Sequence, residues 1–191
     1  MIKKLFLTLL FCFFLTTSVW GSILDQSYSE SNQGDYVQLR YTATATIKVG
    51  QTFLAGITGN LTSCKFYIQK VGSPTGNIFA TLYATSGGAP TGSAIATGDN
   101  VDVSTIGSAA FEVKEFTFST PYGISSGTTY AIMLEGDYTP STTVHVRVGL
   151  DSSSPTYTNG ATYYYGTSWT TQAWDTCFYT YVSLRRIILI Q

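Results

Sequence analysis

Short runs of alternating apolar and polar residues, separated by residues that favour turns, dominate this sequence after residue 22. From Val144 to Val148 the valines alternate with His145 and Arg147, the period-two pattern of an antiparallel strand with one buried face. No stretch of ten or more residues there combines helical periodicity with capping residues. Similar runs predict ten β-strands, near residues 36–42, 45–55, 61–71, 77–85, 93–97, 109–118, 128–135, 143–150, 161–165 and 176–182. Strands this short and numerous predict an all-β fold, a two-sheet antiparallel jelly-roll-like β-sandwich.

The apolar residues of these strands define the expected core. We expect the most buried residues to include Phe53, Phe66, Ile68, Leu82, Phe116, Phe118, Tyr130, Ile132, Val146 and Phe178. Hydrophobic residues make up 44% of the chain and charged residues 11%, so enough apolar surface is present to fold without a disulfide or a metal ion. We therefore expect one domain that needs no cofactor.

Two near-identical segments indicate tight turns. They are Gly72-Ser-Pro-Thr-Gly76 and Gly88-Ala-Pro-Thr-Gly92. Proline presets the first dihedral of a turn, and glycine tolerates the left-handed conformation at its exit. We expect these segments to close two successive connections between strands.

The first 21 residues have the three parts of a signal peptide. Lys3 and Lys4 supply positive charge, residues 5–15 are almost entirely apolar, and a short polar segment leads to Gly21. The apolar part is well short of the ~20 residues that a membrane-spanning helix needs. We expect cleavage near Gly21–Ser22, no membrane span, and a protein that is secreted or held at the cell surface. The chain then divides into a signal peptide (1–21), a β-sandwich domain (22–182) and a C-terminal tail (183–191).

The tail contains four consecutive apolar residues, Ile187 to Ile190. An apolar strand with an unpaired edge promotes association with other chains. We expect residues 184–191 either to add an edge strand to the sandwich or to mediate self-association.

The charge balance bears on the partners. The chain has ten basic and eleven acidic residues, and Lys3 and Lys4 leave with the signal peptide, so the mature net charge is about −3. This balance gives no basic patch for nucleic acid or for an anionic membrane surface.

Two cysteines remain after cleavage, Cys64 and Cys177. Alternation places Cys64 with Phe66 on the buried face, but it turns Cys177 outward because Phe178 faces inward. An oxidising compartment permits a disulfide between the two. A bridge and a pair of separate half-buried thiols both remain open.

Five short segments, in a fixed order, carry a family resemblance. They are Gln51-Thr-Phe-Leu-Ala-Gly56, Leu61-Thr-Ser63, Val71-Gly-Ser-Pro-Thr-Gly76, Gly127-Thr-Thr-Tyr-Ala-Ile132 and Asp175-Thr-Cys-Phe-Tyr-Thr-Tyr181. Over residues 24–182 the chain resembles the bacterial choice-of-anchor extracellular domains, most nearly the choice-of-anchor R type. The resemblance implies a jelly-roll-like sandwich on an exported bacterial or phage-associated protein, and it carries over no catalytic residue. Residues 183–191 depart from the family pattern because they hold no sorting motif, so free secretion and surface attachment both stay open.

Residues able to perform acid–base chemistry are few. His145 is the only histidine, and alternation places it on the solvated face of its strand. A glycosidase needs two carboxyl groups across a cleft, but the available pairs follow the pattern of solvated charges on strand faces. These pairs are Glu112 with Glu115 and Glu135 with Asp137. We expect no enzyme.

A structural calcium ion would need a group of hard oxygen ligands. The acidic residues weighed for this role are scattered in the sequence, so we assign no metal site, and the presence of a structural calcium ion stays open. They are Asp25, Asp35, Asp151 and Asp175.

Aromatic residues concentrate between Tyr157 and Val182. This segment holds nine of the 28 aromatic residues, about twice the number that an even spread would give. Three adjacent tyrosines cannot all face the core, because neighbouring side chains of a strand point to opposite faces. Exposed rings bordered by Ser, Thr and Gln suit stacking on a sugar ring. The candidate ligand-binding residues are Tyr163, Tyr164, Tyr165, Trp169 and Trp174.

Two functions are compatible with these features. The first is a non-catalytic binding or adhesion module that recognises an extracellular glycan or a surface protein. The alternative is a structural or assembly protein of a surface array or a phage-associated particle. In that case the aromatic rings would be packed, and the apolar tail would join subunits.

Overall fold

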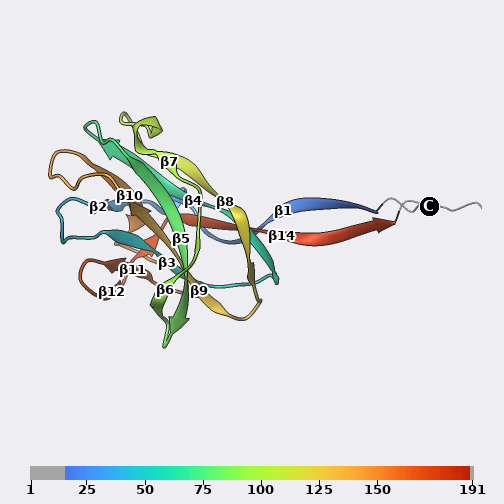
Figure 1. The fold of residues 1–191 in the computed structure, drawn as a ribbon. Helices are drawn as coiled ribbons and strands as arrows, with labels where there is room; N and C mark the ends of the chain where they lie inside the picture. The colour runs from blue at the N-terminus through green and yellow to red at the C-terminus, as the bar shows by residue number, and fades with distance from the viewer. Residues whose placement is uncertain (1–15, 190–191) are drawn as a thin grey trace, which may run out of the picture.

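The computed structural model describes the backbone of residues 16–189 and the side chains of residues 21–184. Within these residues the chain forms fourteen β-strands in two sheets and two three-residue 3-10 helices, η1 (Glu30–Asn32) and η2 (Val103–Thr105). None of the helices in this part of the chain is long and apolar enough to cross a membrane. Figure 1 shows the strands gathered into one sandwich, from which a two-stranded ribbon extends.

Both sheets contain seven strands and are antiparallel throughout their pairings. The first, sheet A, contains β1 (Thr16–Tyr28), β2 (Asp35–Leu39), β4 (Gly59–Val71), β8 (Glu112–Ile124), β10 (His145–Asp151), β13 (Asp175–Thr176) and β14 (Phe178–Leu189). The second, sheet B, contains β3 (Lys48–Leu54), β5 (Asn77–Ser86), β6 (Ala89–Thr97), β7 (Val101–Asp102), β9 (Thr129–Gly136), β11 (Thr162–Tyr165) and β12 (Trp169–Gln172).

The chain crosses repeatedly from one sheet to the other. It does so between β2 and β3, β3 and β4, β4 and β5, β7 and β8, β8 and β9, β9 and β10, β10 and β11, and β12 and β13. This alternation is the connectivity of a jelly-roll-like sandwich. The all-β, two-sheet antiparallel fold expected from the sequence is confirmed, and each of the ten expected strands overlaps an observed strand.

The core lies between the two sheets. All ten residues expected to be buried are buried, with at most 8% of any of them exposed. Phe53 of sheet B packs on Phe178 of sheet A with ring centroids 6.2 Å apart, and Phe66 meets Phe116 edge to face at 6.2 Å. Rings in these arrangements contribute ~0.5–1.5 kcal/mol per pair beyond the burial of their area.

The two glycine-proline segments have different roles. Residues 72–76 connect β4 to β5, with Gly72 and Gly76 at positive φ, as expected. The second segment contributes only its first residue, Gly88, to a turn, because its other four residues lie inside β6. The two-residue hairpin turn is instead Gly87-Gly88, both at positive φ, the conformation that matches the twist of paired strands.

Cys64 and Cys177 are separate, buried free thiols. The expectation that Cys177 points outward is wrong. The strand breaks between β13 and β14 at this residue, whose N–H donates to the Gly149 carbonyl at 3.0 Å, and both Cys177 and Phe178 enter the core. Burial raises the pKa of the Cys64 thiol well above its usual value and that of Cys177 to about 12.

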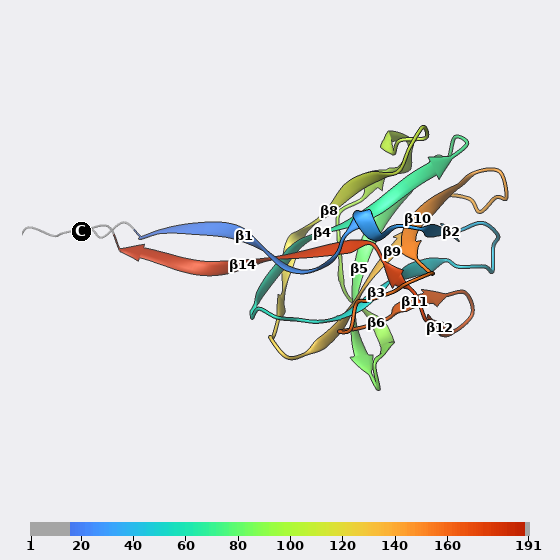
Figure 2. The ribbon, with the colours of Figure 1, turned by 180° about the vertical axis from the view of Figure 1, so that it is seen from behind.

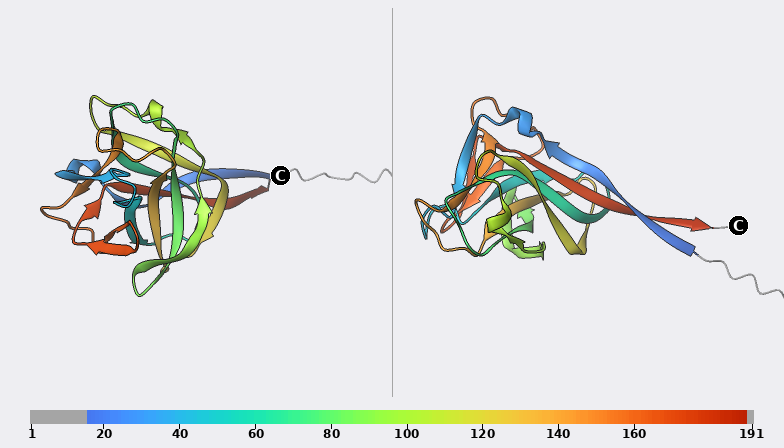
Figure 3. Two further views of the ribbon diagram at one scale, coloured as in Figure 1. Left: turned by 60° about the vertical axis from the view of Figure 1, so that its left-hand side comes forward. Right: turned by 90° about the horizontal axis from the view of Figure 1, so that it is seen from above.

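A two-stranded ribbon extends beyond the sandwich (Figure 2). It is formed by residues 16–21 of β1 and residues 184–189 of β14, and we call it the arm. Figure 3 shows the arm leading away from the sandwich in both views. The expected signal peptide falls mostly on residues 1–15, which lie outside the described residues. Its last residues, 16–21, form one strand of the arm, and residues 183–189 of the expected tail continue β14.

Candidate functional site

A row of five side-chain positions crosses the outer face of sheet B. Trp169 of β12 is paired with Tyr165 of β11, Tyr165 with Lys48 of β3, Lys48 with Glu135 of β9, and Glu135 with Phe79 of β5. Directly paired residues of neighbouring strands place their side chains on the same face, ~5 Å apart. The alternate residues of these strands, among them Val49, Leu134 and Ile78, fill the core. The row therefore consists of the outward-facing side chains of strands whose inward-facing side chains form the core.

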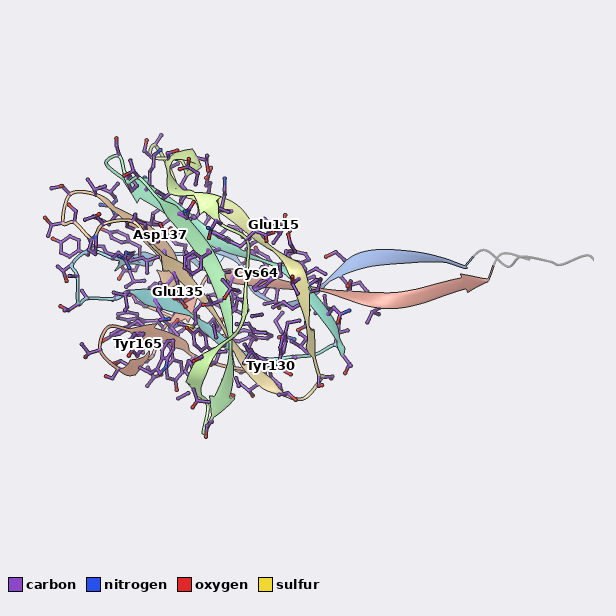
Figure 4. The ribbon with its side chains drawn as sticks, viewed as in Figure 1. Cys64, Glu115, Tyr130, Glu135, Asp137 and Tyr165 are labelled. Carbon is purple, nitrogen blue, oxygen red and sulfur yellow. The ribbon has the colours of Figure 1, made fainter. Side chains whose placement is uncertain are left out.

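This row borders a groove of about 470 Å³. Thr81 and Tyr83 lie beside it on β5, and β6 supplies the far wall. Figure 4 labels Glu135 and Tyr165, which belong to this groove although they come from different strands. Trp169 and Tyr165 are both half-buried, so each ring keeps part of its surface open to solvent.

Three aromatic rings shape one end of the groove. The Trp169 ring meets Tyr83 edge to face at 5.3 Å and Tyr165 edge to face at 5.0 Å. Tyr83 is only 3% exposed and forms a small apolar cluster with Ala131 and Met133 beneath the groove. Trp169 packs against this cluster.

A polar network occupies the floor of the groove. Lys48 Nζ lies 2.8 Å from Glu135 Oε2 and donates to the Tyr83 hydroxyl at 2.6 Å. The Tyr83 hydroxyl donates to Glu135 Oε1 at 2.9 Å, and Thr81 Oγ1 donates to the same oxygen at 2.5 Å. The Lys48 ammonium also lies 5.2 Å from the centroid of Tyr83 and 5.9 Å from that of Tyr165, within cation–π range.

The surroundings of Lys48 favour its charged form. Burial disfavours the charged form of Lys48, but hydrogen bonds to Glu135 and Tyr83 outweigh this effect and raise the pKa of Lys48 above its usual 10.5. Burial also disfavours the charged form of the Tyr83 hydroxyl, and it therefore raises the pKa of that group. Lys48 is thus a fixed cation, and it forms an ion pair with Glu135 within the groove.

The five candidate residues from the sequence divide between two faces of the β11–β12 hairpin. Tyr163, Tyr165 and Trp169 lie on the outer face, although Tyr163 packs mainly on the cluster beneath the groove. Tyr164 and Trp174 line a second cavity of about 480 Å³ on the other side of the hairpin, and Tyr164 also packs on the core. Strand alternation therefore separates the expected single platform into two sites.

Buried hydrogen bonds fix the hairpin to the rest of the sandwich. Gln51 Oε1 accepts from Thr162 Oγ1 and from the Thr176 N–H, both at 3.0 Å, and Gln51 Nε2 donates to Asp175 Oδ1 at 3.1 Å. The two threonine hydroxyls lie 2.9 Å apart. All four residues are at most 3% exposed. We call them the polar lock; since Thr162 begins β11, the lock sets the position of the aromatic residues that follow.

His145 is buried, so the expectation of a solvated histidine is wrong. Its strand β10 lies inside sheet A, between β4 and β2. The Tyr41 ring covers it edge to face at 5.3 Å, and Gln38 Nε2 lies 3.3 Å from His145 Nε2. Burial lowers the pKa of this imidazole.

The acidic pairs weighed from the sequence are engaged separately. Glu112 accepts from the Gly107 N–H at 3.1 Å, while the exposed Glu115 is paired with Lys65 on β4. Asp137 accepts from the Asn77 N–H, and Glu135 belongs to the groove network.

The four aspartates weighed as calcium ligands accept hydrogen bonds from other residues of the chain. Asp25 binds the N–H groups of Gly56 and Ile57, and Asp175 belongs to the polar lock. Asp35 and Asp151 accept from nearby serines. In the part of the chain that the structure describes, no three His, Cys, Asp or Glu side chains form a group able to hold a metal ion.

Sequence reasoning missed Lys48, Thr81 and Tyr83. Each sits at an alternating position of a predicted strand, so the sequence predicts that its side chain points outward. The sequence does not predict which residues lie beside it on the neighbouring strands. A further surface group was also missed: Phe111 stacks on Tyr67 at 5.3 Å, on the outer face of sheet A.

Comparison with models of known protein families, with curated proteins and with solved structures finds no match.

Proposed function

We propose that this protein is a non-catalytic, extracellular carbohydrate-binding module, and that the groove on sheet B is its binding site. The observation that supports the proposal is the pairing of two half-buried rings, Trp169 and Tyr165, with the hydrogen-bonding network of Lys48 and Glu135. A sugar ring presents an apolar C–H face and a rim of hydroxyl groups. Aromatic faces suit the first, and charged or hydroxyl side chains suit the second.

The balance of charge in the groove favours a neutral sugar. Lys48 uses two of its three N–H donors within the network, which leaves one for a ligand hydroxyl. A uronate or a phosphate would gain from Lys48 but would be repelled by Glu135 beside it. The groove is open and offers a ligand few contacts, so we expect each site to bind its sugar weakly and to be specific for the shape of the sugar ring.

A binding role rather than hydrolysis agrees with the lining of the groove. Among the described residues that line it, Glu135 is the only carboxylate. Glycosidases in general use two carboxyl groups on either side of the bond that breaks. Glu135 accepts three hydrogen bonds from Lys48, Thr81 and Tyr83, so both of its oxygens are already engaged within the groove.

An extracellular location is part of the proposal. It draws on the signal-peptide pattern of residues 1–21 and on the resemblance to choice-of-anchor domains, which are exported.

The test is binding of the exported protein to an array of neutral and acidic glycans. Trp169→Ala removes the ring that contacts both tyrosines of the groove, so we expect at least a tenfold loss of affinity for the glycans that the unmodified protein binds. Phe111→Ala is the matched control, because it removes a ring that stacks on the other sheet. We expect Phe111→Ala to leave glycan binding unchanged.

Two results would overturn the proposal. One is glycan binding that survives Trp169→Ala in a folded protein. The other is the absence of binding to any glycan, which would leave the alternative, a structural or assembly protein.

A further inference from the structure

The arm depends on residues 16–21 for its strand pairing. Within the sandwich, β14 is paired on both edges, with β1 on one side and with β4 on the other. The pairing with β4 ends at Ser183 opposite Asn60. Among the residues that the structure describes, β14 from Leu184 to Leu189 is paired only with β1, from Gly21 back to Thr16.

The cleavage site expected from the sequence coincides with the base of this arm. Ser22 is paired with Ser183, and Gly21 with Leu184. Cleavage between Gly21 and Ser22 would therefore remove every residue that pairs with 184–189, while it would leave the pairs from Ser22 to Tyr28 in place.

The part of β1 that remains is anchored to the sandwich by side chains. Asp25 Oδ1 accepts from the N–H groups of Gly56 at 2.9 Å and Ile57 at 2.8 Å. Tyr28 is 6% exposed and donates to Asp151 at 2.9 Å. The buried hydrophobic residues that the structure describes all lie between Tyr28 and Val182. The processed chain thus retains this core, and the change is confined to residues 184–189.

We propose that processing converts residues 184–189 into a docking strand for a second copy of this chain. A strand of six residues with two open edges is not stable alone and exposes unpaired N–H and C=O groups. Every processed copy carries the same open strand, so two copies can satisfy each other through one two-fold interface. The strand of the second copy takes the place of residues 16–21 and continues in line with Ser22.

Charge selects the register of this pairing. In an antiparallel pair with Arg185 or Arg186 opposite an arginine of the second copy, like charges would face each other, which is unfavourable. Pairing Ile187 with Ile187 of the second copy places Arg185 opposite Leu189 and Arg186 opposite Ile188. This register pairs residues 185–189 of both copies, keeps the two-fold symmetry and avoids the repulsion.

The test compares the mass in solution of two forms of the chain by analytical ultracentrifugation over a range of concentrations. The first is the processed form, residues 22–191, and the second retains residues 16–21. We expect the processed form to shift from monomer to dimer as concentration rises, and the form with residues 16–21 to remain monomeric. Ile188→Pro in the processed form removes a strand donor and should abolish the dimer.

Oxidative cross-linking tests whether residues 184–189 of the two copies are in contact. Ile187 lies on the two-fold axis of the proposed pair, opposite Ile187 of the second copy, so Ile187→Cys should give a covalent dimer on oxidation. Val113→Cys, at an exposed position of sheet A, is the control and should give none. A processed form that stays monomeric at all concentrations, or a dimer that persists after Ile188→Pro, would overturn the proposal.

Discussion

The polar lock makes a quantitative prediction about the stability of the sandwich. Replacing Gln51 with leucine preserves the size of the side chain but removes its three hydrogen bonds to Thr162, Thr176 and Asp175. Thr162 keeps its contact with the Thr176 hydroxyl, whereas the Thr176 N–H and Asp175 Oδ1 lose the Gln51 partner. Two buried groups left without a partner cost ~1–3 kcal/mol each, and the more apolar leucine offsets part of this, so we expect a net loss of ~2 kcal/mol.

Gln51→Glu separates the loss of hydrogen bonds from the effect of charge. Glutamate keeps the oxygen that accepts from Thr162 and Thr176, but it places a second carboxyl group against Asp175. Burial already raises the pKa of Asp175 above its usual 3.8. A second carboxylate nearby raises the pKa of the pair further, so the folded state binds more protons than the unfolded state above pH ~4. Stability of Gln51→Glu should therefore fall as pH rises from ~4 to 7, more steeply than that of the unmodified protein.

The assay is urea denaturation followed by tryptophan fluorescence at several pH values. Gln172→Leu is the control, because it makes the same chemical change on the same hairpin at a half-buried position. We expect this control to alter the free energy of unfolding by less than ~0.5 kcal/mol. A Gln51→Leu variant that is as stable as the control would refute the role of the lock.

Two further predictions concern buried titratable groups. Because burial lowers the pKa of His145, the unfolded state binds more protons than the folded state just below pH 6.5. The free energy of unfolding should therefore fall as the pH drops from 7 through that range, and His145→Gln should remove this part of the pH dependence. An unchanged pH profile in the variant would contradict the assignment. Cys64 and Cys177 should resist a thiol-alkylating reagent in the folded protein, and both should react in urea without a reductant; mass spectrometry that finds a disulfide instead would show that the two thiols are bridged.

The sequence was sufficient for the core because alternation is a local property. Whether Phe53 or Ile132 faces inward depends on the parity of its own strand, and a strand of seven or eight residues reveals that parity. Cys177 was misplaced because a break between two strands changes the parity within one residue, and no local signal marks the break. Likewise, β1 lacked a clear alternating pattern and was not predicted as a strand.

The groove was only partly predictable because it depends on pairing between distant strands. Lys48 meets Tyr83, 35 residues away, and Glu135, 87 residues away. Nothing in the composition of either segment states which strand lies next to which, since register is set by the whole sheet. The aromatic cluster was visible because Tyr165 and Trp169 are close in sequence, whereas the polar half of the site was not.

The two proposals together give a reason for the position of the groove relative to the arm. The β11–β12 hairpin, which carries Tyr165 and Trp169, lies at the end of the sandwich remote from the arm in opposite views (Figures 1 and 2). A dimer joined through residues 184–189 would hold its two grooves at the outer ends of one particle. Two weak sites on one particle bind a surface with many sugars far more tightly than one site does, provided that both can reach the surface together. An open groove with few contacts would then be adequate for attachment to a glycan-covered surface, while each single contact stays readily reversible.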